Sequence, residues 1–178
     1  MTPHVRVPQV NVESATPAQR AAAADHERVA TMTNLKRTML QSVPAFRALM
    51  TWYDLRDTVR PFLGERLTTI FAHAISASTD CLICSTFFRR LLIEAGDDPD
   101  ALVLDDRERA VVAYGRRLSA SPFFVPEATF GPVRALFSDE ELVALTAFGA
   151  LMVATNVMVN ALDVPLDGYL EPYRRRAS

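Results

Sequence analysis

The sequence has little of what marks several common classes of protein. Glycine contributes only six and proline eleven of the 178 residues, whereas Ala, Leu, Arg and Glu are abundant. This composition argues against a turn-dense β-sandwich or a collagen-like chain and favours helices. The 19 basic residues nearly balance the 21 acidic ones, so the positive charge that nucleic-acid binding needs is missing. We therefore expect an all-α protein that does not bind nucleic acid.

The chain also lacks an N-terminal apolar stretch of the kind that forms a secretory signal, which predicts a cytosolic location. Residues 142–162 carry no formal charge and reach the length that crosses a bilayer. Threonine and asparagine interrupt this run, no basic cluster flanks it, and an acidic cap at 138–141 precedes it. We expect a buried central helix, not a membrane span.

Capping residues and apolar spacing predict a single-domain helical bundle of about eight helices. Thr16 to Gln19 and Asp105 to Glu108 form capping-box patterns, and Gly96 follows a last apolar turn. Helices are predicted at about residues 17–32, 35–40, 45–59, 65–77, 81–95, 109–118, 127–137 and 139–162. This divides the chain into an extended arm (1–15), a helical domain (16–165) and a C-terminal tail (166–178) that wraps over or docks on the domain.

The two cysteines are the feature that carries chemistry. Cys81 and Cys84 lie three residues apart at the predicted start of a helix, which the polar residues 78–80 can cap. Helix N-terminal amides lower the pKa of a thiol, whereas the carboxylate of Asp80 opposes a second negative charge, so the sequence leaves the direction open. Such a pair can attack an oxidant and close to a disulfide.

The cysteine pair also has three interpretations other than redox chemistry. Free cysteines often act as small buried hydrophobes, so inert packing stays open. A zinc site needs four ligands, and His4, His26 and His73 have no ligand-like spacing. A structural disulfide between neighbouring turns of one helix stabilises little and is not kept in a reducing cytosol. We expect no metal and no cofactor.

The stretch from Gly64 to Gly96 resembles the core of the carboxymuconolactone decarboxylase and alkyl hydroperoxidase D superfamily, with Cys81 and Cys84 at the positions of its redox pair. The likeness extends to the capping patterns at 105–110 and 138–142, and so covers roughly residues 40–165. It implies an all-helical, oligomeric protein. The branch that has the cysteine pair reduces peroxides or passes electrons to a peroxiredoxin, whereas the decarboxylase branch lacks the pair.

Two positions depart from the pattern of that branch. Its glutamate, separated from the first cysteine by eleven residues, is replaced by Thr69, and its histidine, separated from the second cysteine by three residues, by Phe88. Neither side chain can relay a proton as the family residues do. His73 lies four residues after Thr69 on the same helix face, and we hypothesise that it accepts a proton from Cys81 or Cys84. The alternative is a core or interface histidine that bonds to a backbone carbonyl.

Three functions follow from these residues. The first is a thiol-dependent peroxidase or disulfide oxidoreductase that reduces an organic hydroperoxide and is restored by a dithiol or lipoyl-type reductant. The second is a non-catalytic helical oligomer with buried, slow thiols, and the third a cofactor-free decarboxylase-type enzyme. Trp52 and Tyr53 could wall a substrate pocket, although such aromatic residues are more often core. The apolar helices at 142–162 and 67–77 also predict a homo-oligomer.

Overall fold

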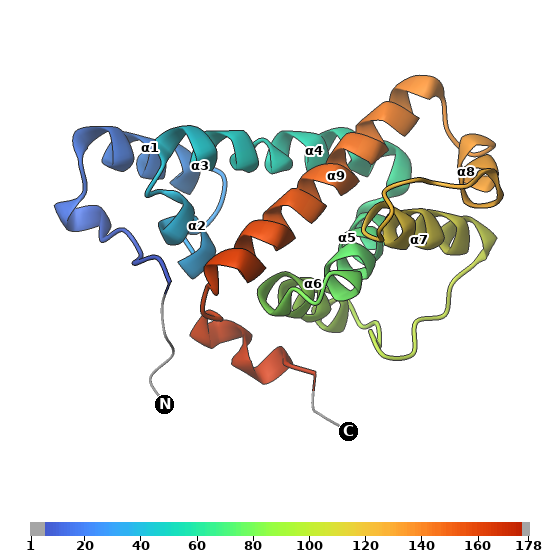
Figure 1. Ribbon diagram of the computed structural model, residues 1–178. Coiled ribbons are helices and arrows are strands. Elements are labelled where there is room, and N and C mark those ends of the chain that lie inside the picture. Colours follow the sequence, from blue (N-terminus) through green and yellow to red (C-terminus); the bar gives the residue numbers. More distant parts are fainter. Residues whose placement is uncertain (1–5, 176–178) are drawn as a thin grey trace.

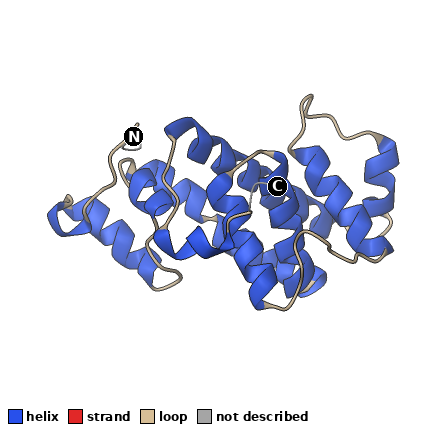
Figure 2. Ribbon diagram, turned by 90° about the horizontal axis from the view of Figure 1, so that it is seen from below, coloured by secondary structure: helices blue, strands red, loops and turns tan. Residues whose placement is uncertain are grey.

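The structure is a computed structural model that describes residues 6–175, and it is helical along its length (Figure 1). Those residues form nine α-helices and two 3₁₀ helices with no strand, as Figure 2 also shows. The all-α prediction is confirmed, with one α-helix more than the expected eight. The elements are η1 (Val12–Ser14), α1 (Pro17–Glu27), α2 (Asn34–Met39), α3 (Val43–Met50), α4 (Trp52–Leu63), α5 (Glu65–Ser78), α6 (Leu82–Glu94), α7 (Asp106–Leu118), α8 (Glu127–Arg134), α9 (Asp139–Leu162) and η2 (Gly168–Tyr173).

Most helix boundaries coincide with the predicted capping residues. Capping boxes open α1, α7 and α9 at Thr16, Asp105 and Ser138, where each side chain accepts a bond from a backbone amide three residues on. Gly96, with a φ of 90°, follows the end of α6 in the left-handed conformation expected for it. The local signals in the sequence therefore set these ends.

The end of α1 and the division of the 45–59 segment are two of the differences from the prediction. Helix α1 ends at Glu27, because the amides of Val29 and Ala30 both bond to the carbonyl of His26 and close the last turn. The single helix expected over 45–59 is divided into α3 and α4. At the division the hydroxyl of Thr51 donates to the carbonyl of Ala48 at 2.6 Å, a side-chain bond that competes with helix continuation.

Helix α9 is the central element of the main core (Figure 1). It packs against α4, α5, α7 and α8. Phe71 of α5 stacks on Phe148 of α9, with ring centroids 6.0 Å apart. A Cβ atom at Gly149 would lie 2.6 Å from a methyl carbon of Leu118, so a larger residue there would require the Leu118 side chain to shift.

Helix α9 is also the one helix in residues 6–175 that is long and apolar enough to cross a membrane. Its contacts with four other helices and its capping box make it a core helix of this fold, as the sequence analysis expects. Val143 and Val157 on α9 nevertheless remain exposed. One side of the helix is therefore apolar and uncovered within the described chain.

The segments at both ends of the chain dock on this body. Of the predicted arm, residues 6–15 are described; they include η1, and Val10 is buried against α1, α2 and α3. In the predicted tail, η2 packs on α6 and Leu170 is 1% exposed. The arginines of the tail that are described form ion pairs, Arg174 with Glu171 and Arg175 with Asp100. His4 and Arg176 lie outside the described residues.

A buried asparagine joins α9 to the corner between α5 and α6. The side-chain amide of Asn156, which has no exposed surface, donates to Thr79 Oγ1 at 2.8 Å and to Ser76 Oγ at 3.4 Å. One turn further along α9, Asn160 donates to the carbonyl of Thr79 at 2.8 Å. These bonds hold the turn that leads into Cys81.

Replacing Asn156 with alanine should therefore destabilise the protein by about 3 kcal/mol, through lost hydrogen bonds and a buried void. Urea unfolding of the variant measures this free energy. Asn160→Ala is the matched control, because it removes one bond from the same turn at an exposed position and should cost less than about 1 kcal/mol. Equal losses in the two variants would contradict the role assigned to Asn156.

Candidate active site

Cys81 is the N-cap residue of α6. The sequence assigns this cap to the polar residues 78–80, but the backbone amide of Cys84 donates to Sγ of Cys81 at 3.4 Å. Asp80, with a φ of 50°, turns the chain immediately before the cap and is exposed to solvent. The sulfur of Cys81 therefore takes the position in which a cap oxygen usually receives the helix amides.

The environment shifts the pKa values of the two thiols in opposite directions. The Cys84 thiol donates to Cys81 and lowers the pKa of Cys81, and the backbone amides of Cys84 and Ile83 lower it further against the effect of burial. The same thiol–thiolate bond, together with burial, raises the pKa of Cys84 well above its usual range. Cys81 is thus the thiol of the pair that loses its proton more readily, and Cys84 the one that keeps it.

Both cysteines are buried, with exposed fractions of 0% for Cys81 and 6% for Cys84. Cys84, however, lines a cavity of about 110 Å³ between α2, α3, α4, α6, α9 and the C-terminal segment. Most of its lining is apolar, and the full set is Thr33, Leu35, Lys36, Leu49, Met50, Trp52, Tyr53, Ile83, Cys84, Phe87, Phe88, Met152, Thr155, Asp167, Tyr169 and Leu170. A small, mainly apolar molecule placed there would touch the Cys84 sulfur.

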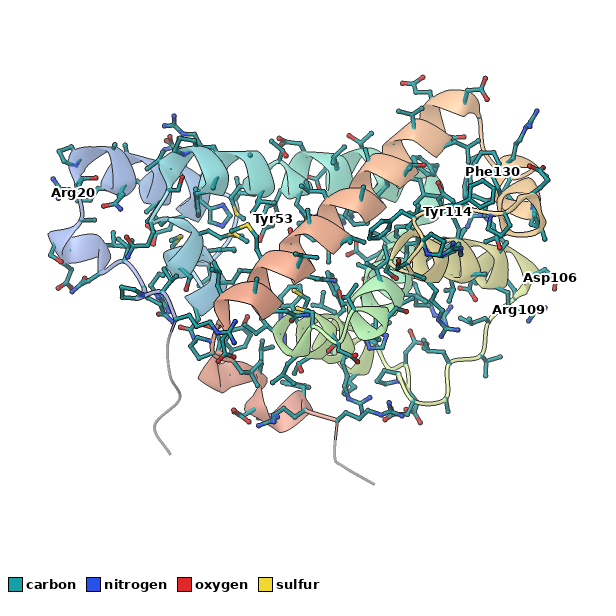
Figure 3. All side chains as sticks on the ribbon, in the orientation of Figure 1. Arg20, Tyr53, Asp106, Arg109, Tyr114 and Phe130 are labelled. Atoms are coloured by element: carbon teal, nitrogen blue, oxygen red, sulfur yellow. The ribbon has the colours of Figure 1, made fainter. Side chains whose placement is uncertain are left out.

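Trp52 and Tyr53 line this cavity, which is one of the two roles that the sequence suggests for them. Their rings lie at the start of α4 and meet edge to face, with centroids 5.0 Å apart. In Figure 3 Tyr53 lies below α4, between the N-terminal helices and α9. The indole nitrogen of Trp52 is buried and has no hydrogen-bond partner among residues 6–175.

The cavity also has a polar part, formed by Lys36 and Asp167. Both side chains are 7% exposed. Lys36 donates from Nζ to the carbonyl of Thr31 at 2.6 Å and lies 5.2 Å from the centre of the Tyr53 ring. Burial lowers the pKa of Lys36 to about 8 and raises the pKa of Asp167, while each charge partly compensates the other. These charges adjoin the cavity that Cys84 lines.

The two positions that depart from the family pattern are both buried. Thr69 uses its hydroxyl to donate to the carbonyl of Glu65 at 3.0 Å, a bond within its own helix. Phe88 is 4% exposed, lines the cavity and lies 6.2 Å from the Trp52 ring. An apolar wall thus stands where the family pattern has its histidine.

His73 is half-buried on α5, and burial lowers its pKa to about 4. The charges that act on it are those of Arg89, Asp100, Arg116 and Arg175. Within the described part of the chain it makes no hydrogen bond to either cysteine and is not among the residues of the cavity wall. Its role as a proton acceptor stays a prediction from the sequence.

Sequence reasoning missed Lys36 and Asp167. A signal for the first is present, because Lys36 is the one lysine in a chain whose other basic residues are all arginines. An arginine keeps its charge when buried, whereas a lysine can lose its proton. For Asp167 no local pattern exists, since it lies in a segment that resembles a solvated tail. No group of metal-binding side chains occurs within residues 6–175 either.

These observations define an all-helical protein with a two-thiol site beside a mainly apolar cavity. No family model matches the sequence, and no curated protein matches it. Solved structures do match its fold. The debrominase Bmp8 without ligand superposes with a TM-score of 0.77 at 16% identity, over 94% of this chain and 95% of that one.

Two further matches carry the name of the fold. The AhpD core of an uncharacterised peroxidase-related protein from Ralstonia eutropha JMP134 has a TM-score of 0.70 at 17% identity, over 96% of each chain. A putative antioxidant defence protein AhpD from Agrobacterium tumefaciens has a TM-score of 0.60 at 19% identity, over 71% of this chain and 93% of that one. The chain therefore has the AhpD-like fold, as its sequence resemblance implies.

Proposed function

We propose that this protein is a thiol-dependent oxidoreductase that uses Cys84 and Cys81 to reduce a small hydroperoxide. The observation that carries the proposal is the difference between the two cysteines: Cys84 lines an apolar cavity, and Cys81, whose pKa is lowered, caps the helix next to it. Access assigns the attack to Cys84. Cys81 accepts a hydrogen bond from the Cys84 thiol, and this contact makes it the group that receives the proton as the Cys84 sulfur forms its bond to oxygen.

The reaction then proceeds in two steps. As Cys84 attacks the outer oxygen of the hydroperoxide, its proton passes to Cys81, the O–O bond breaks, and Cys84 becomes a sulfenic acid. Cys81 returns the proton to the leaving alkoxide, which becomes an alcohol. The Cys81 thiolate next attacks the Cys84 sulfur, forms the disulfide and releases hydroxide. Two thiols are oxidised while one peroxide bond is reduced.

A cellular dithiol or lipoyl-type reductant in the cytosol would restore the pair by thiol–disulfide exchange. Both sulfurs are buried in the closed structure, so the reductant must reach Cys84 through the cavity or after movement of the covering segment. The burial also matches what the non-catalytic alternative expects. A cavity that ends on a thiol is the feature that favours catalysis.

Reductive dehalogenation is a second candidate, favoured by two observations. Phe88, Trp52 and Phe87 give the cavity aromatic walls. Bmp8 is a debrominase, and a cysteine-to-alanine variant of it, solved with 2,3,4-tribromopyrrole, superposes with a TM-score of 0.74 at 16% identity over 94% of each chain. In this reaction the two thiols close to a disulfide, a carbon–hydrogen bond replaces the carbon–halogen bond, and a halide ion and a proton are released.

Mass spectrometry after brief exposure to each substrate tests both candidates. With tert-butyl hydroperoxide we expect the protein to lose two hydrogens and to form one equivalent of tert-butanol. With a brominated phenol, the same mass change together with bromide release would assign the second function instead. Unmodified thiols with both substrates would leave the non-catalytic alternative as the function.

We also propose that the protein self-associates through the uncovered side of α9. The exposed Val143 and Val157 lie about four helical turns apart, on the same side of α9. Most of α5, by contrast, is already buried within one chain. Light scattering measures the mass in solution. A monomer at all concentrations would contradict the proposal.

A further inference from the structure

One carboxylate oxygen in the cavity wall has no partner. Asp167 is 7% exposed, and its Oδ1 accepts a bond from the backbone amide of Asn34 at 2.9 Å. Its Oδ2 is buried and accepts no hydrogen bond from any group in residues 6–175. A buried acceptor without a donor costs about 1–3 kcal/mol, and more when it is charged. Such exceptions are rare in proteins and require an explanation.

The contacts that hold the C-terminal segment on α2 do not involve Oδ2 of Asp167. Asn34 already ties the C-terminal segment to α2, through its amide to Asp167 Oδ1 and through its side chain to the carbonyls of Pro165 and Leu166. Burial raises the pKa of Asp167, and the amide of Asn34 and the charges of Arg37 and Lys36 act against this effect. The second oxygen is therefore an acceptor that the fold holds in place without using it.

Asp167 and Cys84 line the same cavity. At about 110 Å³ it is smaller than the engineered cavity of about 150 Å³ that holds benzene, so one small ring or a short chain fills it. The residue that carries the thiol and the residue that carries the carboxylate thus both belong to the wall around an occupant. Its body must be apolar, because Leu49, Met50 and Met152 form much of the wall.

We propose that Asp167 determines the specificity of this cavity by accepting a hydrogen bond, through Oδ2, from an O–H or N–H group of a small, mainly apolar substrate. The inference rests on the proposed function in taking the occupant to be the molecule that Cys84 reduces. The bond satisfies the orphan acceptor only when such a donor is present. Molecules of the same size without a donor leave the buried Oδ2 unpaired, and the site discriminates against them.

Binding can be measured without turnover, because Trp52 is the single tryptophan of the chain and lines the cavity. Its fluorescence is followed while phenol, which has an O–H donor, or toluene, which has none, is added to the thiol form of the protein. In Asp167→Asn the amide oxygen can keep the bond to Asn34, and an N–H donor then replaces the acceptor in the cavity. We expect this variant to bind phenol at least about tenfold more weakly, with less than about a twofold change for toluene.

Asp163→Asn is the matched control, since it makes the same chemical change four residues earlier at an exposed position. It should bind both probes as the wild type does. Unchanged phenol affinity in Asp167→Asn, an equal loss for both probes, or no binding of phenol to the wild type would overturn the inference. A selective loss of phenol binding in a protein whose thiols do not react would support this inference while contradicting the proposed function.

Discussion

Cys84→Ser is expected to abolish hydroperoxide reduction, lowering the rate at least about a thousandfold, because a serine hydroxyl at this position has no accessible anionic form. The measurement is consumption of tert-butyl hydroperoxide in the presence of excess dithiol. The substitution changes one atom on the cavity wall and leaves the Cys81 cap in place. A Cys84→Ser protein that still cycles would rule out the proposed reaction.

Cys81→Ser is the companion variant and should behave differently. Cys84 keeps its place beside the cavity but loses the acceptor of its proton, so one turnover should be slower and should stop at a sulfenic acid that a dimedone probe can label. Steady turnover should be lost as well, because no second thiol forms the disulfide. Identical behaviour of the two variants, with no labelled intermediate in either, would contradict the division of roles.

His73→Ala separates the two candidate proton acceptors. With Cys81 as the acceptor, the variant should keep the pH dependence of peroxide reduction within experimental error, because His73 makes no bond to either sulfur in the described chain. A shifted pH profile with unchanged stability would instead support the role that the sequence predicts for His73.

The protein is expected to lose stability in mild acid. Burial lowers the pKa of both His26 and His73 to about 4, so each is neutral in the folded protein at a pH where the unfolded chain, with a pKa near 6.5, is protonated. The unfolded state binds more protons between these values, and stability must fall as the pH drops from 6.5 towards 4. Between pH 7 and pH 5 we expect a loss of about 1.5 kcal/mol for each histidine.

Urea unfolding at the two pH values tests this expectation. His26 packs between Phe46 and Tyr53, with ring centroids 5.5 and 5.3 Å away, and its Nε2 has no partner among the described residues. The His26→Leu variant should therefore stay folded at pH 7, and its loss of unfolding free energy between pH 7 and pH 5 should be about half that of the wild type. His73→Leu should reduce this loss by the same amount. A wild-type stability that is constant between pH 7 and pH 5 would contradict both assignments.

The fold could be predicted from the sequence because its signals are local. The capping boxes at Thr16, Asp105 and Ser138 and the left-handed glycine at 96 act within one helical turn, and each appears where expected. The division of the 45–59 segment at Thr51 was not predicted, since a threonine inside a helix usually bonds back without ending it.

The candidate site was predictable only in part. The spacing of Cys81 and Cys84 shows that they share a helix turn, but not which sulfur caps the helix and which meets the cavity. Lys36 and Asp167 are 131 residues apart and meet because the C-terminal segment docks on α2, a long-range contact with no sequence pattern. The charge of Asp80 was expected to oppose a thiolate, yet its side chain is exposed to solvent.

The docking of the C-terminal segment has a consequence for biosynthesis. Val164 and Leu170 pack against the cysteines, and Asp167 to Leu170 close one side of the cavity. A nascent chain that has reached only the end of α9 lacks this part of the packing around Cys81 and Cys84. The packing of the two thiols is therefore completed only after residues 164–170 have been synthesised.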